Sequence, residues 1–228
     1  MPHTIITVVG TARLRHDPER ARVRIGIGFE GSKRDSVMAA TRTAHESLTG
    51  SLGTLLDPTA GPVVSWHSED IRVWGQRPWS QEGTRLPVEF HSAVFVDAEF
   101  DDFEALSEWI DVVAIRDGVA VDGIEWLLAE GTDTQLVAEA RRGAVQDAVA
   151  KAREYATALG LGDVHPVSLA DPGLLEGGAG GGDGPQARFA PLMAKAGGAP
   201  GGGIELKPDE ITVEVSVHAR FSAAPESA

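Results

Sequence analysis

The chain has 228 residues, of which 42% are hydrophobic, and its 34 acidic residues outnumber its 20 lysines and arginines, giving a formal charge of -14. This length and composition are sufficient for a hydrophobic core, so a folded protein is expected. The negative charge repels phosphate backbones and anionic membrane faces, which argues against nucleic acid as a partner. Cysteine is absent, which excludes disulfides, thiol catalysis and thiolate metal sites.

The N-terminus, Met1-Pro2-His3-Thr4, leads directly into an apolar stretch and has no basic region of the kind that begins a signal peptide. No run of residues approaches the roughly 18 apolar residues that a membrane-spanning helix needs. The sequence therefore predicts a cytoplasmic protein without a membrane span.

Alternating and helical patterns follow one another along the chain. In order, they predict a strand at 4–9, a polar connection at 10–20, strands at 22–29, 63–74, 87–100, 121–129, 165–169 and 211–217, and helices at 32–57, 101–113 and 132–159. Most neighbouring strands are predicted to be antiparallel, with helices packed on one face. The expected fold class is therefore α+β, with residues 1–228 as a single domain.

The helix at 132–159 has alanines at every fourth position, a pattern that predicts a face of small side chains. These residues are Ala140, Ala144, Ala148, Ala152 and Ala156. Such a face allows a helix to approach a sheet or another helix closely.

Two segments depart from compact secondary structure. The strands at 63–74 and 87–100 are joined by a turn-rich stretch, which predicts a long projecting hairpin at about 63–100. Residues 171–203 hold twelve of the 27 glycines and predict a flexible loop.

Three stretches of the chain form a set whose order and spacing are informative. They are Ile6-Thr7-Val8-Val9-Gly10-Thr11-Ala12 followed by Asp17-Pro18-Glu19-Arg20-Ala21-Arg22-Val23, the helix end from Ala148 to Gly160, and Ile204 to Val213. Together they resemble the SIMPL-domain family, named for a signalling molecule that associates with a pelle-like kinase. The resemblance spans residues 5–221 and implies an α+β fold and a tendency to form homo-oligomers. The family includes bacterial secreted or periplasmic members and offers no catalytic residues for transfer. The chain departs from it in lacking a signal peptide and in its extended glycine-rich loop.

Gly26-Ile27-Gly28-Phe29-Glu30-Gly31 matches the G-x-G-x-x-G pattern of dinucleotide sites. In such sites the glycines form the turn after a buried parallel strand, whereas Gly26 and Gly28 lie within an alternating strand. We interpret them as strand glycines that allow close packing, and expect no cofactor.

His67, Glu69, Glu89 and His91 lie on the two predicted hairpin strands, each pair on one face of its strand. Nitrogen and oxygen ligands of this kind are able to hold a metal ion if the strand register brings them together. A metal- or small-ligand-binding enzyme that uses this hairpin face is therefore the alternative function.

The principal hypothesis is a non-enzymatic protein that works by binding itself, or another protein. Exposed tryptophan and arginine are typical of interface anchors, and apolar residues within a flexible segment are able to dock on a neighbour. The candidate interface residues are Trp74, Trp79, Arg72 and Arg77 in the hairpin, and Phe189, Leu192 and Met193 in the glycine-rich segment. No catalytic or metal residues are assigned.

Overall fold

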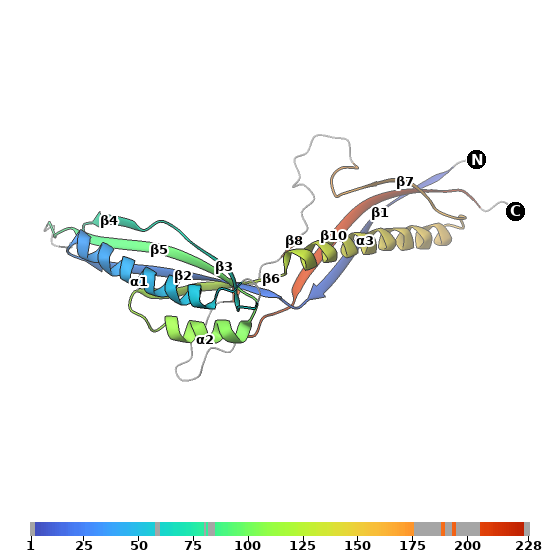
Figure 1. The fold of residues 1–228 in the computed structure, drawn as a ribbon. Helices are drawn as coiled ribbons and strands as arrows, with labels where there is room; N and C mark the ends of the chain where they lie inside the picture. The colour runs from blue at the N-terminus through green and yellow to red at the C-terminus, as the bar shows by residue number, and fades with distance from the viewer. Residues whose placement is uncertain are drawn as a thin grey trace. The chain divides into compact units, whose positions relative to one another are not determined.

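The structure is a computed structural model, and it describes residues 3–57, 60–79, 81, 85–175, 188–189, 193–194 and 206–225. The chain forms two compact units, each with its own antiparallel sheet and helices (Figure 1). Unit 1 comprises Met1–Asp17, Leu128–Ala190 and Glu210–Ala228, and unit 2 comprises Pro18–Leu127 and Pro191–Asp209. The predicted α+β class is confirmed. The sequence predicted one domain over residues 1–228, and the folded chain divides into these two units.

The sheet of unit 1 has the strand order β1-β10-β7, with the short strand β8 also paired to β10. The strands of this sheet are β1 (Thr4–His16), β10 (Ile211–Ala223), β7 (His165–Ala170) and β8 (Arg188–Phe189). The helix α3 (Glu130–Ala158) belongs to the same unit. The prediction ended the first strand at residue 9 and is wrong, because β1 pairs with β10 continuously as far as His16.

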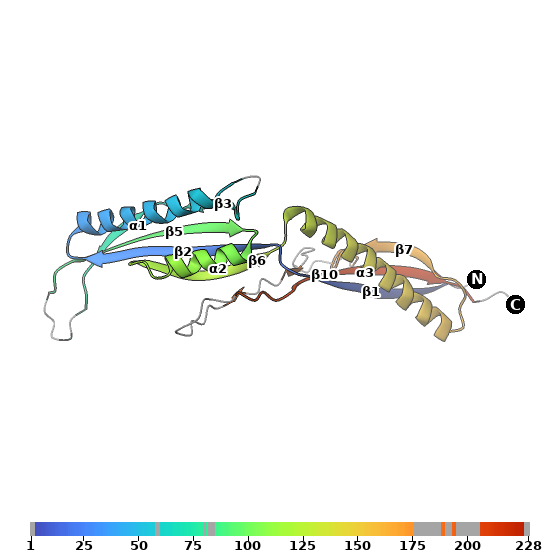
Figure 2. The same cartoon turned by 60° about the horizontal axis from the view of Figure 1, so that its bottom comes forward.

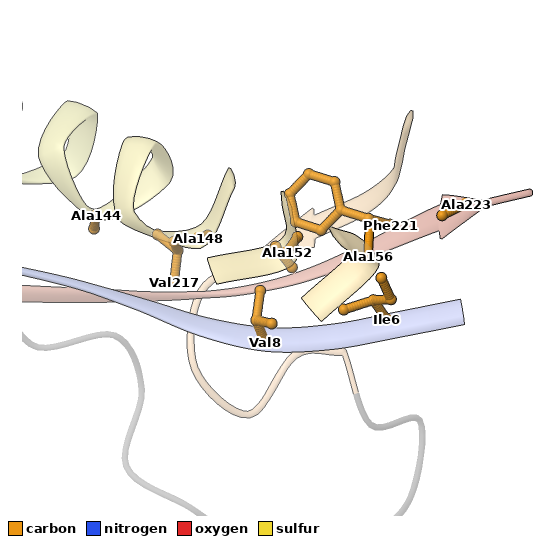
Figure 3. Packing of buried hydrophobic residues seen from close by; sticks show 10 residues of the cluster. Ile6, Val8, Ala144, Ala148, Ala152, Ala156, Val217, Phe221 and Ala223 are labelled. Atoms are coloured by element: carbon orange, nitrogen blue, oxygen red, sulfur yellow. The ribbon is translucent and has the colours of Figure 1, made fainter. Parts of the chain in front are cut away.

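Helix α3 lies against β1 and β10 through its small side chains (Figure 3). The five alanines that recur every four residues are all buried, as predicted. Opposite them on β1 stands Gly10, where an added Cβ would lie 2.0 Å from the backbone oxygen of Ala144. Gly10 therefore permits a helix-to-strand distance that no larger residue tolerates.

Two side chains of α3 also cover the free edge of β1. The Thr11 backbone N–H donates to Asp147 Oδ2 at 2.7 Å, and Lys151 Nζ donates to the Val9 carbonyl at 3.0 Å. Lys151 and Asp147 form an ion pair of 2.6 Å. An unpaired strand edge is a template for unwanted pairing, so this contact blocks the centre of the edge.

This contact makes the free energy of unfolding depend on pH. The hydrogen bond from Lys151, followed by that from the Thr11 N–H, lowers the pKa of Asp147. A lowered folded-state pKa stabilises the fold above the unfolded value, about 3.9, and this contribution is lost as pH falls through the folded pKa. We expect Asp147→Asn to be less stable than the wild type at pH 7, with the difference shrinking below about pH 4. Urea unfolding of both proteins between pH 7 and pH 3 measures this, and a difference that does not change with pH contradicts it.

The sheet of unit 2 has the strand order β3-β5-β2-β6-β9, with β4 paired to β5 beyond β3. Its strands are β2 (Arg20–Gly31), β3 (Val63–Ser68), β4 (Arg72–Gln76), β5 (Glu89–Phe100), β6 (Val119–Leu127) and β9 (Met193–Ala194). Helices α1 (Arg34–Leu55) and α2 (Phe103–Val113) lie on one face of this sheet (Figure 2). We call the other face, which none of the helices in the described residues covers, the open face.

The helix-covered face holds the core of unit 2. Odd-numbered residues of β2, such as Val23 and Ile25, are buried on this face, and even-numbered residues such as Arg22 and Arg24 lie on the open face. The Phe100 ring, fully buried at the end of β5, packs 5.5 Å from the Trp109 ring of α2. The alternation predicted for residues 22–29 therefore sets the polarity of the two faces.

The strand predicted at 63–74 is divided into β3 and β4 by residues 69–71, and both strands pair with β5. On its other side β5 pairs with β2 from Ala21 to Gly31. The pairing of β4 with β5 ends at Gln76 and Glu89, one residue beyond the pair Gly31 and Phe90. The strands of the expected hairpin thus belong to the sheet of unit 2.

Candidate functional site

Four of the predicted interface residues lie on β4 and in the connection that follows it. We call Arg72, Trp74, Arg77 and Trp79 the hairpin-tip surface. All four are exposed, and Trp79 keeps 81% of its surface in solvent. Trp74 is 44% exposed and stacks on the His91 ring at 5.7 Å. The structure therefore leaves two tryptophans near one end of the sheet available for contact.

The hairpin-tip surface is partly held in place by polar contacts. Arg77 Nη1 donates to the Leu86 carbonyl at 2.7 Å, which ties the two sides of the connection together. His91, on which Trp74 stacks, pairs through Nδ1 with Glu30 Oε2 at 3.7 Å. Trp74 thus has a defined orientation before any partner arrives, which lowers the entropic cost of binding.

The three candidates in the glycine-rich segment have a different status. The backbone of Phe189 belongs to β8 and pairs with Val213 of β10, and that of Met193 belongs to β9 and pairs with Glu125 of β6. Leu192 lies outside the described residues, as does most of the loop predicted at 171–203. Phe189 is assigned to unit 1 and Met193 to unit 2.

The proposed metal face of His67, Glu69, Glu89 and His91 is not a single cluster. His67 stands opposite Asp97 on β5, and His91 is six residues away along the same strand. At about 3.3 Å per residue this separates the two histidines by about 20 Å. Among the residues that the structure describes, no three His, Asp or Glu side chains are placed to hold a metal ion. The strand register thus contradicts the geometric basis of the alternative function.

Sequence reasoning missed a network of ion pairs on the open face of unit 2. Alternate residues of β2 present three arginines to carboxylates of the neighbouring strands β5 and β6. The pairs are Arg20 with Glu99 at 2.7 Å, Arg22 with Glu99 at 3.4 Å and with Glu125 at 3.3 Å, and Arg24 with Asp97 at 3.0 Å. The spacing of Arg20, Arg22 and Arg24 was a signal for this network, but its partners depend on strand register.

Arg24 lies at the centre of this network. Its Nη2 donates to Glu69 Oε1 at 2.7 Å, and its guanidinium lies 4.4 Å from the centre of the Phe95 ring. The hydrogen bond that Arg24 donates to Glu69 raises the pKa of Arg24, so the guanidinium stays charged. The surrounding side chains line a hollow of about 410 Å³. The arginines that line this hollow are already paired with carboxylates. The ion pairs therefore act as a brace that joins β2 to the neighbouring strands β5 and β6.

Removing Arg24 is expected to reveal how strongly this brace stabilises unit 2. Arg24→Leu removes the partner that Asp97, which is mostly buried, has at 3.0 Å, and leaves it beside His67 Nε2 at 3.3 Å, which is a cation only when protonated. We expect a loss of about 1–2 kcal/mol of unfolding free energy, a moderate value because Arg24 itself is half-exposed. In the double variant Arg24→Leu/Asp97→Asn part of this loss should be recovered. Urea unfolding of the four proteins measures the coupling, and strictly additive effects contradict the brace.

The glycine pattern at residues 26–31 lies within β2, as the strand interpretation expects. Gly26 and Gly28 pair with Phe95 and Ala93 of β5 and do not form a turn before a helix. A Cβ on Gly26 would lie 3.0 Å from Asp122 Oδ2. These glycines serve close packing on the open face, and the geometry of a dinucleotide turn is not present at them.

In the parts of the chain that the structure describes, no helix is both long enough and apolar enough to cross a membrane. A comparison with curated proteins gives no match to this chain. A family model described as "SIMPL: Protein of unknown function (DUF541)" matches residues 6–221, nearly the whole sequence. The match includes both sheets and all three helices described above. The chain therefore belongs to the SIMPL (DUF541) family.

Proposed function

We propose that this protein is a non-enzymatic interaction protein that associates with copies of itself through the hairpin-tip surface. The observation that carries the proposal is the exposure of Trp79 and Trp74 beside Arg72 and Arg77. Tryptophan and arginine are the residue types most enriched among the anchors of protein interfaces. Tryptophans that are exposed to solvent do not contribute to a hydrophobic core. Binding to another protein surface is therefore the role that their chemistry supports.

The energetics favour Trp79 as the principal anchor. Burying most of a tryptophan side chain removes on the order of 150–200 Å² of largely apolar surface from water. At roughly 25 cal/mol per Å² this supplies about 4 kcal/mol before the costs of association are subtracted. A few such contacts are enough for association in the micromolar range.

Trp79→Ala is expected to weaken self-association by more than about 1 kcal/mol, about fivefold or more in Kd. Its unfolding curve should match that of the wild type, because Trp79 is 81% exposed and contributes little to the fold. Sedimentation equilibrium measures the association and urea unfolding measures the stability. Tyr155→Ala on α3 is the matched control, since this aromatic residue is also exposed but lies in unit 1.

The opposite result has a clear meaning for this surface. If Trp79→Ala unfolds the protein while association continues, that tryptophan supports the fold and the hairpin-tip surface is wrong. If the variant and the control associate equally, the contact lies elsewhere. The cytoplasmic location and the absence of catalysis stay predictions from the sequence.

A further inference from the structure

The solvent-facing side of α2 carries acidic side chains that lead to exposed apolar residues. Glu104, Glu108 and Asp111 are exposed at positions i, i+4 and i+7, and Ile115 follows at i+11, just beyond the helix end. Val112 lies beside them and is 56% exposed. We call these five residues the α2 stripe.

The α2 stripe and the hairpin-tip surface are complementary in charge. Between residues 101 and 117 the sequence has six acidic residues and one arginine. Between residues 72 and 89 it has three arginines and two glutamates, within a chain that is strongly acidic as a whole. Local charges of opposite sign steer two surfaces together and fix their register.

The two surfaces also carry the most exposed large apolar side chains in the described part of the chain. Ile115 is 84% exposed and Trp79 is 81% exposed. An aromatic anchor with neighbouring arginines, placed against aliphatic residues with an acidic surround, has the composition of an interface centre and its rim. The hairpin-tip surface thus supplies aromatic and basic side chains, and the α2 stripe supplies aliphatic and acidic ones.

Within one chain, Trp74 and the α2 stripe lie on opposite faces of the unit 2 sheet. Trp74 pairs with His91, which stands opposite Glu30 of β2, so this ring lies on the open face of the sheet. Helix α2 packs on the covered face, where its Trp109 contacts Phe100. Because the sheet separates the two, a contact that includes Trp74 requires a second copy.

We propose that the hairpin-tip surface of one chain docks on the α2 stripe of a second copy. This inference rests on the proposed self-association and names the surface that receives the tip. The contact joins two different surfaces, so a bound pair still offers one free tip on one copy and one free stripe on the other. Such heterologous contacts add further copies until a ring closes or a filament grows.

A mixing experiment with full-length variants tests this arrangement. Trp79→Ala removes the tip anchor and Ile115→Ser removes the apolar end of the stripe, and both residues are too exposed to support the fold. We expect each variant alone to associate about fivefold or more weakly than the wild type. In an equimolar mixture, the intact tip of Ile115→Ser meets the intact stripe of Trp79→Ala. Sedimentation velocity should then show a 1:1 pair and no larger species.

A second pair of variants, Arg72→Glu and Glu108→Lys, reverses one charge on each surface, and each variant alone should associate more weakly than the wild type. In their mixture both the two unchanged surfaces and the two reversed ones are complementary, so species larger than a pair should form again. Wild-type association should also weaken several-fold as salt is raised from about 0.05 M to about 0.5 M, because exposed charges are screened.

Three outcomes would overturn the inference. If Trp79→Ala weakens association while Ile115→Ser and Glu108→Lys do not, the tip docks elsewhere and the proposed function survives. If both single variants lose association but their mixture forms no pair, the interface is not tip-to-stripe. If the wild type does not associate at all, the proposed function fails as well.

Discussion

Replacing Gly10 by alanine is expected to be among the most damaging single-methyl changes in unit 1. The new Cβ would lie 2.0 Å from the Ala144 backbone oxygen and 2.7 Å from the Ala148 Cβ. Neither atom is at the end of a flexible side chain, so α3 must move away from β1 and loosen the packing of its buried alanines. We expect a loss of about 3 kcal/mol of unfolding free energy, or about 6–12 °C in Tm for a chain of this size.

Gly50→Ala on α1 is the matched control, because a Cβ there meets nothing within 4 Å. In a helix this exchange should stabilise by about 0.5–1 kcal/mol. Thermal unfolding of the two variants measures both effects. A Gly10→Ala protein as stable as the wild type would mean that α3 does not approach β1 as closely as described.

Phe100→Ala is expected to be the most damaging truncation in unit 2. This ring is fully buried at the end of β5, opposite Ala21 of β2 and Val63 of β3, and it contacts Trp109 of α2. It therefore joins the sheet to one of its helices, and its removal leaves a cavity between them. Truncations of this kind cost about 3–5 kcal/mol.

Val112→Ala is the control for this change, since Val112 is apolar but exposed on the same helix. Its effect should stay within about 0.5 kcal/mol. Urea unfolding of both variants gives the comparison. Equal midpoints for Phe100→Ala and the wild type would contradict the described core.

Periodicity was enough to predict the elements whose burial follows from local sequence. The alanines of α3 repeat every four residues, and they form its buried face as predicted. Val213 and Val217 of β10 likewise alternate with polar residues and are buried. These predictions succeed because one face of each element packs against a core. The spacing of its small and apolar residues shows directly which face that is.

Features that depend on partners far apart in the chain were not predictable in this way. The sequence showed Gly10 as the start of a connection, yet β1 continues because Gly10 pairs with Val217. The same limit applies to the metal face of the alternative function. Only the register of β3 on β5 shows that His67 meets Asp97 and stands far from His91. The ion pairs of Arg24 also depend on strand register, so they were not predictable from the sequence.

The candidate interface was predictable in part. Tryptophan and arginine at 72–79 indicated a contact surface, and the structure leaves these side chains exposed. The α2 stripe was not predictable, because helical periodicity indicates which face is buried and does not show whether the other face binds a partner. Exposure of Ile115 is a property of the folded chain, since isoleucine is among the residue types that are most often buried.

The central claim is that this chain associates with itself. Size-exclusion chromatography with light scattering on the wild-type protein, at concentrations from about 1 µM to about 100 µM, tests it most directly. We expect the weight-average mass to rise with concentration above that of a single chain. A mass that stays at that of one chain across the whole range would contradict the account.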